Sequence, residues 1–185
     1  MKHNKSLNAR SIILCAMFSA LIAVGAFIKI PVPVVPFTLQ FLFTNLAGLL
    51  LGKRLASISV GVYLLIGLIG IPVFTGGGGL SYIFVPTFGY LIGFLVGAYV
   101  TGSIMEKLKD TSFKSLLLAS FAGLIIVYLF GMVYYYFIAN YYLNSPIGVW
   151  SLILYCFILA VPGDILICFV SASLSKRLIP IVKRG

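Results

Sequence analysis

The stretch IPVFTGGGGLSYIFVPTFGY, residues 71–90, interrupts a chain that is otherwise almost continuously apolar. It holds two prolines and no charge, so we predict a connection that is not a helix. A flexible linker is one interpretation, but linkers are usually rich in serine and charge, whereas this segment is aromatic. Its glycine N–H groups could instead face a ligand as hydrogen-bond donors. These glycines are Gly76, Gly77, Gly78 and Gly79.

The composition indicates an integral membrane protein. Of 185 residues, 62% are hydrophobic and only 9% are charged, and the mean hydropathy is +1.17. A soluble domain of this size could not bury so much apolar surface, and several runs approach the roughly 20 residues that cross a bilayer. The first run follows a basic segment like a signal peptide, but no small-residue cleavage site precedes a polar domain, so we expect a retained helix.

We predict an all-α fold, a single membrane domain over residues 1–185 with six spans. The second span is short and follows a proline-rich segment, 30–36, that looks re-entrant. The sixth contains Pro162 and Gly163, which predict a kink near its middle. The predicted spans are residues 11–28, 37–51, 55–71, 86–105, 116–138 and 147–174.

The basic residues predict the orientation. Twelve of the thirteen lysines and arginines lie in segments that the six spans would place on one side, and only Lys29 lies on the other. By the positive-inside rule, both termini are cytoplasmic in the cell membrane, and the glycine run is outside. Because these basic clusters flank apolar runs, the net charge of +10 reflects topology, and nucleic acid is not an expected partner.

Small residues at four-residue spacing indicate close helix packing. Gly89, Gly93 and Gly97 form a double GxxxG motif in the fourth span, for which we expect packing inside the bundle. Gly48 and Gly52 form another such motif. An AxxxA motif, Ala16 and Ala20, lies in the first span.

Asp164 is the residue that most suggests a site. It lies inside the sixth span, and an ionisable group at mid-membrane is costly and normally faces a cavity or pathway. Glu106 and Asp110 lie among lysines and are expected to be their solvated partners. The sequence shows no nucleophile with a histidine base, no carboxylate pair and no metal cluster, so we predict neither an enzyme nor a cofactor. His3 has no companion ligands, and the three cysteines are expected to be buried small hydrophobic residues.

Five segments in order resemble the BioY family, the biotin-binding S components of energy-coupling factor (ECF) transporters. They are IPVPVVPFTLQ (30–40), LAGLLLGKRLA (46–56), YLLIGLIGIPVFTGGGG (63–79), PTFGYLIGF (86–94) and PGD (162–164). The resemblance covers essentially the whole chain. It implies a six-helix subunit that captures biotin from outside and works with a transmembrane coupling subunit and two ATPase subunits, docking through the AxxxA motif of Ala16 and Ala20.

Biotin would then bind around Asp164, whose carboxylate can accept the two ureido N–H groups. Tyr82 and Tyr90 offer rings and hydroxyls, and the glycine-run N–H groups or Lys29 would meet the valerate carboxylate. The full set of predicted contacts is Asp164, Tyr82, Ser81, Tyr90, Gln40, Gly76, Gly77, Gly78, Gly79 and Lys29. One departure stands out: family members commonly carry a lysine three residues after this aspartate, and here that residue is Ile167.

Two other functions remain open on the sequence. A different small-vitamin S component would share the architecture, and a purely structural membrane protein would bind no ligand. A ligand-dependent thermal shift distinguishes them, because selective binding stabilises the native state.

Overall fold

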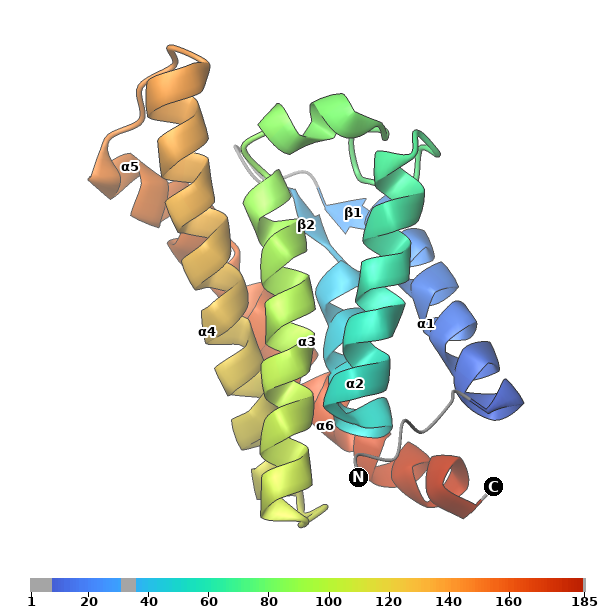
Figure 1. Cartoon of the computed structure of the whole chain (residues 1–185). Helices are drawn as coiled ribbons and strands as arrows, with labels where there is room; N and C mark the ends of the chain where they lie inside the picture. The colour runs from blue at the N-terminus through green and yellow to red at the C-terminus, as the bar shows by residue number, and fades with distance from the viewer. Residues whose placement is uncertain (1–7, 31–35, 185) are drawn as a thin grey trace, which may run out of the picture.

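A computed structural model describes residues 8–30 and 36–184, which are almost entirely helical (Figure 1). His3 and most of the proline-rich segment lie outside these residues. A short antiparallel ribbon pairs β1 (Lys29–Ile30) with β2 (Phe37–Thr38). The helices are α1 (Ala9–Phe27), α2 (Gln40–Leu68), α3 (Phe88–Leu108), α4 (Phe113–Phe137), α5 (Val149–Ile153) and α6 (Val161–Arg184).

Within the described parts of the chain, five helical segments are long and apolar enough to cross a membrane: Ala9–Phe27, Gln40–Leu68, Phe88–Leu108, Phe113–Tyr142 and Val149–Val182. The all-α, multi-span prediction is confirmed at this level. A count of six crossings stays a prediction.

The helix α2 reverses direction at Gly52, which has φ +78° and ψ 173°. The amide of Gln40 donates to the hydroxyl of Tyr63 at 2.6 Å, although in a straight helix these residues would be roughly 35 Å apart. The stretch predicted as the second and third spans is therefore one helical hairpin, with arms 40–51 and 53–68. Glu106 of α3 holds the turn, since its carboxylate accepts the backbone N–H of Lys53 at 3.0 Å and pairs with its ammonium at 3.3 Å.

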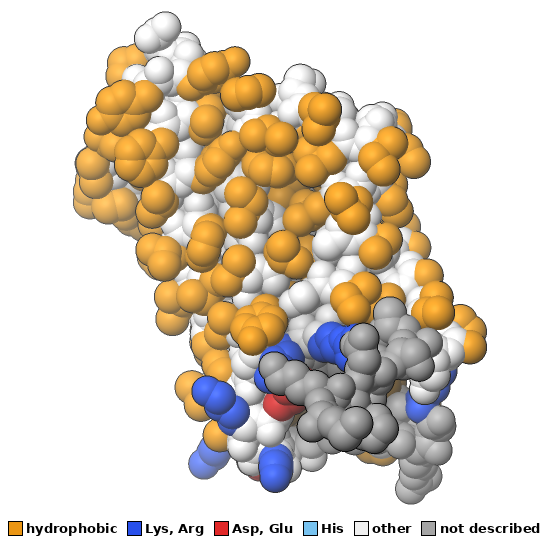
Figure 2. Space-filling model, viewed as in Figure 1, with side chains coloured by type: hydrophobic (Ala, Val, Ile, Leu, Met, Phe, Trp, Pro, Cys, Tyr) orange, Lys and Arg blue, Asp and Glu red, His pale blue; other side chains and the backbone are white. Residues whose placement is uncertain are grey.

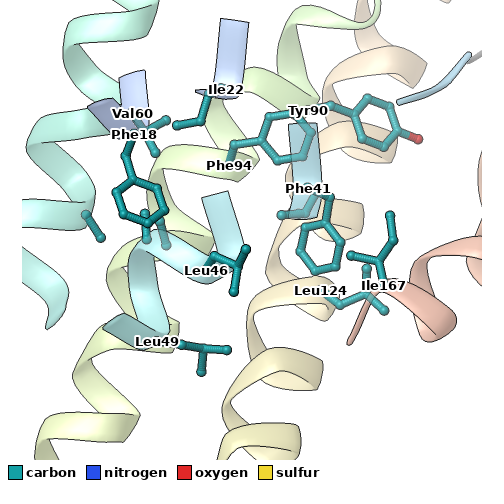
Figure 3. Close-up of a cluster of buried hydrophobic side chains, with 14 of the residues drawn as sticks. Phe18, Ile22, Phe41, Leu46, Leu49, Val60, Tyr90, Phe94, Leu124 and Ile167 are labelled. Atoms are coloured by element: carbon teal, nitrogen blue, oxygen red, sulfur yellow. The ribbon is translucent and has the colours of Figure 1, made fainter. Parts of the chain in front are cut away.

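The glycine motifs of α3 pack inside the bundle, as predicted. A Cβ added at Gly93 would lie 2.8 Å from the carbonyl oxygen of Val127, and one at Gly97 would lie 3.0 Å from that of Gly123. The backbones of α3 and α4 therefore approach closely along this seam. Beside it, large apolar side chains from every long helix fill the centre of the bundle (Figure 3).

One end of the molecule gathers the charged residues. In Figure 2 the apolar side chains cover most of the visible face, and the lysines and arginines collect at its lower edge. The first turn of α1 and the end of α6 meet there, because the Arg10 guanidinium donates to the carbonyl of Val182. The described ends of the chain thus lie on the same side of the bundle.

Asp110, at the same end, differs from its prediction. Its carboxylate accepts hydrogen bonds from Ser112 and Ser115 at the start of α4 and pairs with no lysine among the described residues. The hydrogen bonds from the Ser112 hydroxyl, then from Ser115, hold the pKa of Asp110 below its usual value. The prediction for Glu106 is confirmed by its ion pair with Lys53.

The sixth predicted span is interrupted earlier than expected. A π-helical segment, Leu154–Ile158, follows α5, and a turn at residues 159–160 precedes α6. Pro162 therefore lies in the first turn of α6, where its missing N–H costs no helical hydrogen bond. The helix α6 also extends ten residues beyond the predicted end, to Arg184.

The stretch 71–90 is non-helical only in its first part. A short 3₁₀ helix, Leu80–Phe84, follows the glycine run, and α3 begins at Phe88. The glycine run is folded back on itself, because Phe74 and Gly77 exchange two backbone hydrogen bonds.

Candidate functional site

A cavity that is partly open to solvent lies at the end of the bundle where β2 and the 71–90 stretch gather, opposite the described ends of the chain. Its wall combines β2, both ends of the 71–90 stretch, and α2, α3, α4 and α6. The polar lining residues are Thr38, Gln40, Thr75, Tyr82, Thr87, Tyr90, Tyr128, Cys156 and Asp164; the apolar ones are Pro36, Phe37, Phe41, Leu91, Phe94, Val127 and Ala160.

Asp164 supplies the one carboxylate of this cavity. It lies in the first turn of α6, where the partial positive charge of the helix N-terminus favours an anion. The hydroxyl of Tyr128, from the middle of α4, donates to its Oδ2 at 2.5 Å. One oxygen of the carboxylate is thus fixed by the protein, and acceptor capacity remains for a ligand with N–H groups.

Tyr90 is set into the wall by the absence of a side chain at Gly131. A Cβ at that position would lie 2.4 Å from the tyrosine ring. The Tyr90 hydroxyl donates to the carbonyl of Cys156 at 3.2 Å, and its ring is nearly perpendicular to that of Tyr128, with centroids 6.1 Å apart. These contacts give the cavity a rigid aromatic side next to the carboxylate.

Gln40 joins three segments of the wall. Its side-chain oxygen accepts from the hydroxyls of Thr38 at 3.2 Å and Thr75 at 3.3 Å, and its amide donates to Tyr63 at 2.6 Å. The Tyr63 hydroxyl in turn donates to the carbonyl of Val73. Only 3% of Gln40 is exposed, so this network fixes the glycine-bearing connection against α2 and β2.

Tyr82 reaches the cavity from the 3₁₀ helix. Its ring lies 4.7 Å from that of Phe74, and Phe74 occupies the space left by Gly67, where a Cβ would be 2.1 Å from the Phe74 ring. Phe37 likewise packs over Gly163, where an added Cβ would lie 2.6 Å from the Phe37 ring. Aromatic rings thus pack against the backbone at two glycines close to the cavity.

Four of the predicted contact residues come together in the cavity: Asp164, Tyr82, Tyr90 and Gln40. Ser81 is exposed and lies outside the lining, and so do Gly76, Gly77, Gly78 and Gly79. The N–H groups of Gly77 and Gly79 donate to the carbonyls of Phe74 and Gly67, at 3.1 and 2.7 Å. Two of the four expected donors are therefore already engaged, and direct ligand contacts of this run stay a prediction.

Lys29 is exposed and outside the lining, but it is adjacent to it. In the β1–β2 ribbon Lys29 pairs with Thr38, whose side chain lines the cavity. The register thus places the backbone of Lys29 beside a lining residue, and its contact with a ligand stays a prediction.

Sequence reasoning missed Tyr128, Thr38, Thr75, Thr87 and Cys156 as lining residues. Tyr128 is 36 residues from Asp164 and lies in an unbroken apolar run, where a tyrosine gives little signal. The three cysteines are buried as predicted. Ile167, by contrast, lies outside the lining and packs near Phe41 and Leu124 beneath the cavity (Figure 3).

Ala16 and Ala20 lie on the exposed side of α1. Neighbouring apolar side chains are also exposed, Met17 by 45% and Val24 by 52%. The predicted outward orientation of the AxxxA motif agrees with this placement, and a docking role stays a prediction.

Comparisons with known proteins relate these features to a family. The model of the BioY family matches residues 1–184. The "Probable biotin transporter BioY" of Lysinibacillus sphaericus is 45% identical over 174 residues, which cover 94% of this chain and 89% of that protein. The "Biotin transporter BioY" of Thermotoga maritima is 42% identical over 137 residues, covering 74% and 78%. A crystal structure of the S-component for biotin from an ECF-type ABC transporter superposes with a TM-score of 0.79 at 32% identity, covering 96% of this chain and 94% of that one.

Proposed function

Because this chain belongs to the BioY family, we propose that the cavity around Asp164 is its biotin site. The chain is a biotin-transport protein of the S-component type and not an enzyme. The observation that carries the assignment of the site is the single carboxylate, held by Tyr128 at 2.5 Å in an otherwise aromatic and apolar cavity.

The chemistry of biotin matches this arrangement. Its ureido ring carries two N–H donors, which the free acceptor sites of Asp164 would receive as charge-assisted hydrogen bonds. The rings of Tyr90 and Tyr82 would cover the apolar thioether ring, and the hydroxyls of Thr38 and Thr75 are available as further polar contacts. The valerate carboxylate would extend toward Lys29, next to Thr38 in the ribbon.

Tyr128 can be compared with the lysine that family members commonly carry where this chain has Ile167. A lysine at that position would offer Asp164 a charged neighbour on the same helix face, three residues along. In this chain the phenol of Tyr128 supplies a donor to the carboxylate, so the polar partner of Asp164 comes from α4.

We further propose six crossings with both termini cytoplasmic, counting the arms of the α2 hairpin separately. The reversal at Gly52 and the meeting of α1 and α6 at the charged end support this topology. It places the cavity at the outer side and the basic residues at the inner side. Release into the cytoplasm would depend on a coupling subunit and two ATPase subunits, since no nucleotide-binding motif occurs in the chain.

A vitamin panel tests the proposed function. The purified chain is heated with biotin, riboflavin or thiamine, and the melting temperature is compared with that of the chain alone. At 100 times the dissociation constant, a ligand stabilises the native state by about 2.7 kcal/mol. Biotin alone should give such a shift; a shift with another vitamin and none with biotin would assign the cavity to a different solute.

A further inference from the structure

A second hollow lies at the charged end, where the Gly52 turn of α2 meets the last two turns of α3. Its wall contains Lys53 and a run of α3 side chains that includes Tyr99, Ser103 and Lys107. None of these residues belongs to the biotin cavity. In Figure 2 the basic side chains begin where the apolar face of the bundle ends.

The α3 side of the hollow is graded in polarity. Tyr99, Ser103 and Lys107 follow one another at four-residue steps and so share one helix face, roughly 6 Å apart. Val100 and Ile104 add apolar surface beside them. From the bundle centre outward, the wall thus presents aromatic and apolar groups, then a hydroxyl, then an ammonium. These groups would complement the acyl chains, the ester and the phosphate of a phospholipid, in that order.

The hydroxyl of Ser103 is available to a ligand. Its oxygen has no hydrogen-bond partner among the described residues, as is also true of a few other buried polar atoms. A buried polar group without a partner is costly and calls for an explanation. A phosphate or ester oxygen placed between Ser103 and Lys107 would accept a hydrogen bond from the Ser103 hydroxyl.

The charges of the hollow favour an anion. Lys53 and Lys107 contribute two ammonium groups, and Glu106 contributes one carboxylate. That carboxylate is already engaged by the ammonium and backbone N–H of Lys53, so it also holds Lys53 in place. The net charge of plus one complements a lipid with one negative charge better than a zwitterionic lipid.

We propose that this hollow binds the headgroup of an anionic phospholipid through Ser103, Lys53 and Lys107. The site would fix one lipid against the Gly52 turn at the inner side of the bundle. It is separate from the biotin cavity and does not depend on biotin binding.

Native mass spectrometry of the purified chain, titrated with phosphatidylglycerol or with phosphatidylcholine, tests the proposal. The wild type should retain phosphatidylglycerol preferentially, and Lys107→Gln should reduce that preference about fivefold, the effect of one lysine near an anionic headgroup. Ser103→Ala should reduce retention of phosphatidylglycerol in the same direction. Lys114→Gln is the matched control, since Lys114 is an exposed lysine of the same end that lies outside the hollow.

Biotin titration of each variant verifies that it is folded, independently of the lipid result. Equal retention of the two lipids by the wild type would overturn the proposal. An equal loss in Lys107→Gln and Lys114→Gln would also overturn it, because it would mean diffuse attraction rather than a site. If Lys107→Gln left lipid retention unchanged but abolished uptake in cells with the energising subunits, the hollow would belong to a protein partner instead.

Discussion

Replacing Asp164 by asparagine removes the carboxylate from the cavity while keeping the size of the side chain. The hydroxyl of Tyr128, 2.5 Å from Oδ2 in the wild type, can still donate to the amide oxygen of the variant. The amide NH₂ then faces the ureido N–H groups of biotin, so donor meets donor. The substitution therefore tests the proposed ligand contact more than the packing around it.

The expected loss is about two orders of magnitude in biotin affinity. A hydrogen bond to a charged group contributes roughly 1.5–3 kcal/mol, and 1.4 kcal/mol is tenfold in a binding constant. Tyr128→Phe keeps the carboxylate but removes its fixed donor, so the loss should be smaller, about tenfold. Because Tyr128 acts through Asp164, the double variant should bind only slightly more weakly than Asp164→Asn alone.

Isothermal titration with biotin of the purified wild type, both single variants and the double variant gives the four affinities of this double-mutant cycle. Tyr155→Phe is the control, since Tyr155 lies outside the cavity lining and its loss of a hydroxyl should leave the affinity unchanged. Wild-type affinity in Asp164→Asn would remove Asp164 from the site. Additive losses in the double variant would show that Tyr128 contributes independently of the carboxylate.

Three further outcomes follow from the same structure. A cysteine introduced at Ser81 should react with an impermeant reagent from outside the cell and one at Ser112 should not; the reverse pattern would invert the topology. Ala20→Trp should lower biotin uptake in cells while binding by the isolated chain persists, and joint loss of both would mean that this side of α1 packs internally. Gly131→Ala should displace the ring of Tyr90, which would lie 2.4 Å from the new Cβ. The substitution should lower the free energy of unfolding by about 1–3 kcal/mol, seen as a lower melting temperature, and weaken biotin binding. Unchanged titrations and melting curves would contradict this account of the wall.

Much of the fold followed from the sequence because membrane helices are encoded by long apolar runs. The break near Gly52 was predicted as a loop between two spans, since Lys53 and Arg54 interrupt the run. The interruption of the last span was placed at Pro162 and Gly163, although it lies at residues 159–160. Proline is tolerated in the first turn of a helix, so it marks the start of α6 rather than a bend inside it.

The site was only partly predictable. Asp164 is conspicuous because a carboxylate in an apolar run is rare. Tyr90 and Gln40 lie in segments that resemble the family, and Tyr82 lies between two of them. Tyr128 could not be found in this way, since its role depends on a contact between α4 and α6. Ligand contacts of the glycine run stay a prediction, and the N–H groups of Gly77 and Gly79 take part in folding the connection. Composition alone identifies the glycine run as an unusual segment, whereas its role depends on contacts that only the three-dimensional structure gives.

The cavity wall draws on segments from residue 36 to residue 164, and this has a consequence for how the protein is made. Its carboxylate lies near the start of the last helix, so a nascent chain that has not yet emerged beyond α6 contains the aromatic side of the cavity but no anion. On the proposed assignment of the cavity, such a chain would lack a complete site, so biotin would not stabilise it during insertion. On the same assignment, the docking of α6 against α4, which brings Asp164 to Tyr128, is the step that bound biotin would stabilise. Starvation for the vitamin should therefore leave the insertion of the first helices unaffected and raise the fraction of chains in which α6 is not docked.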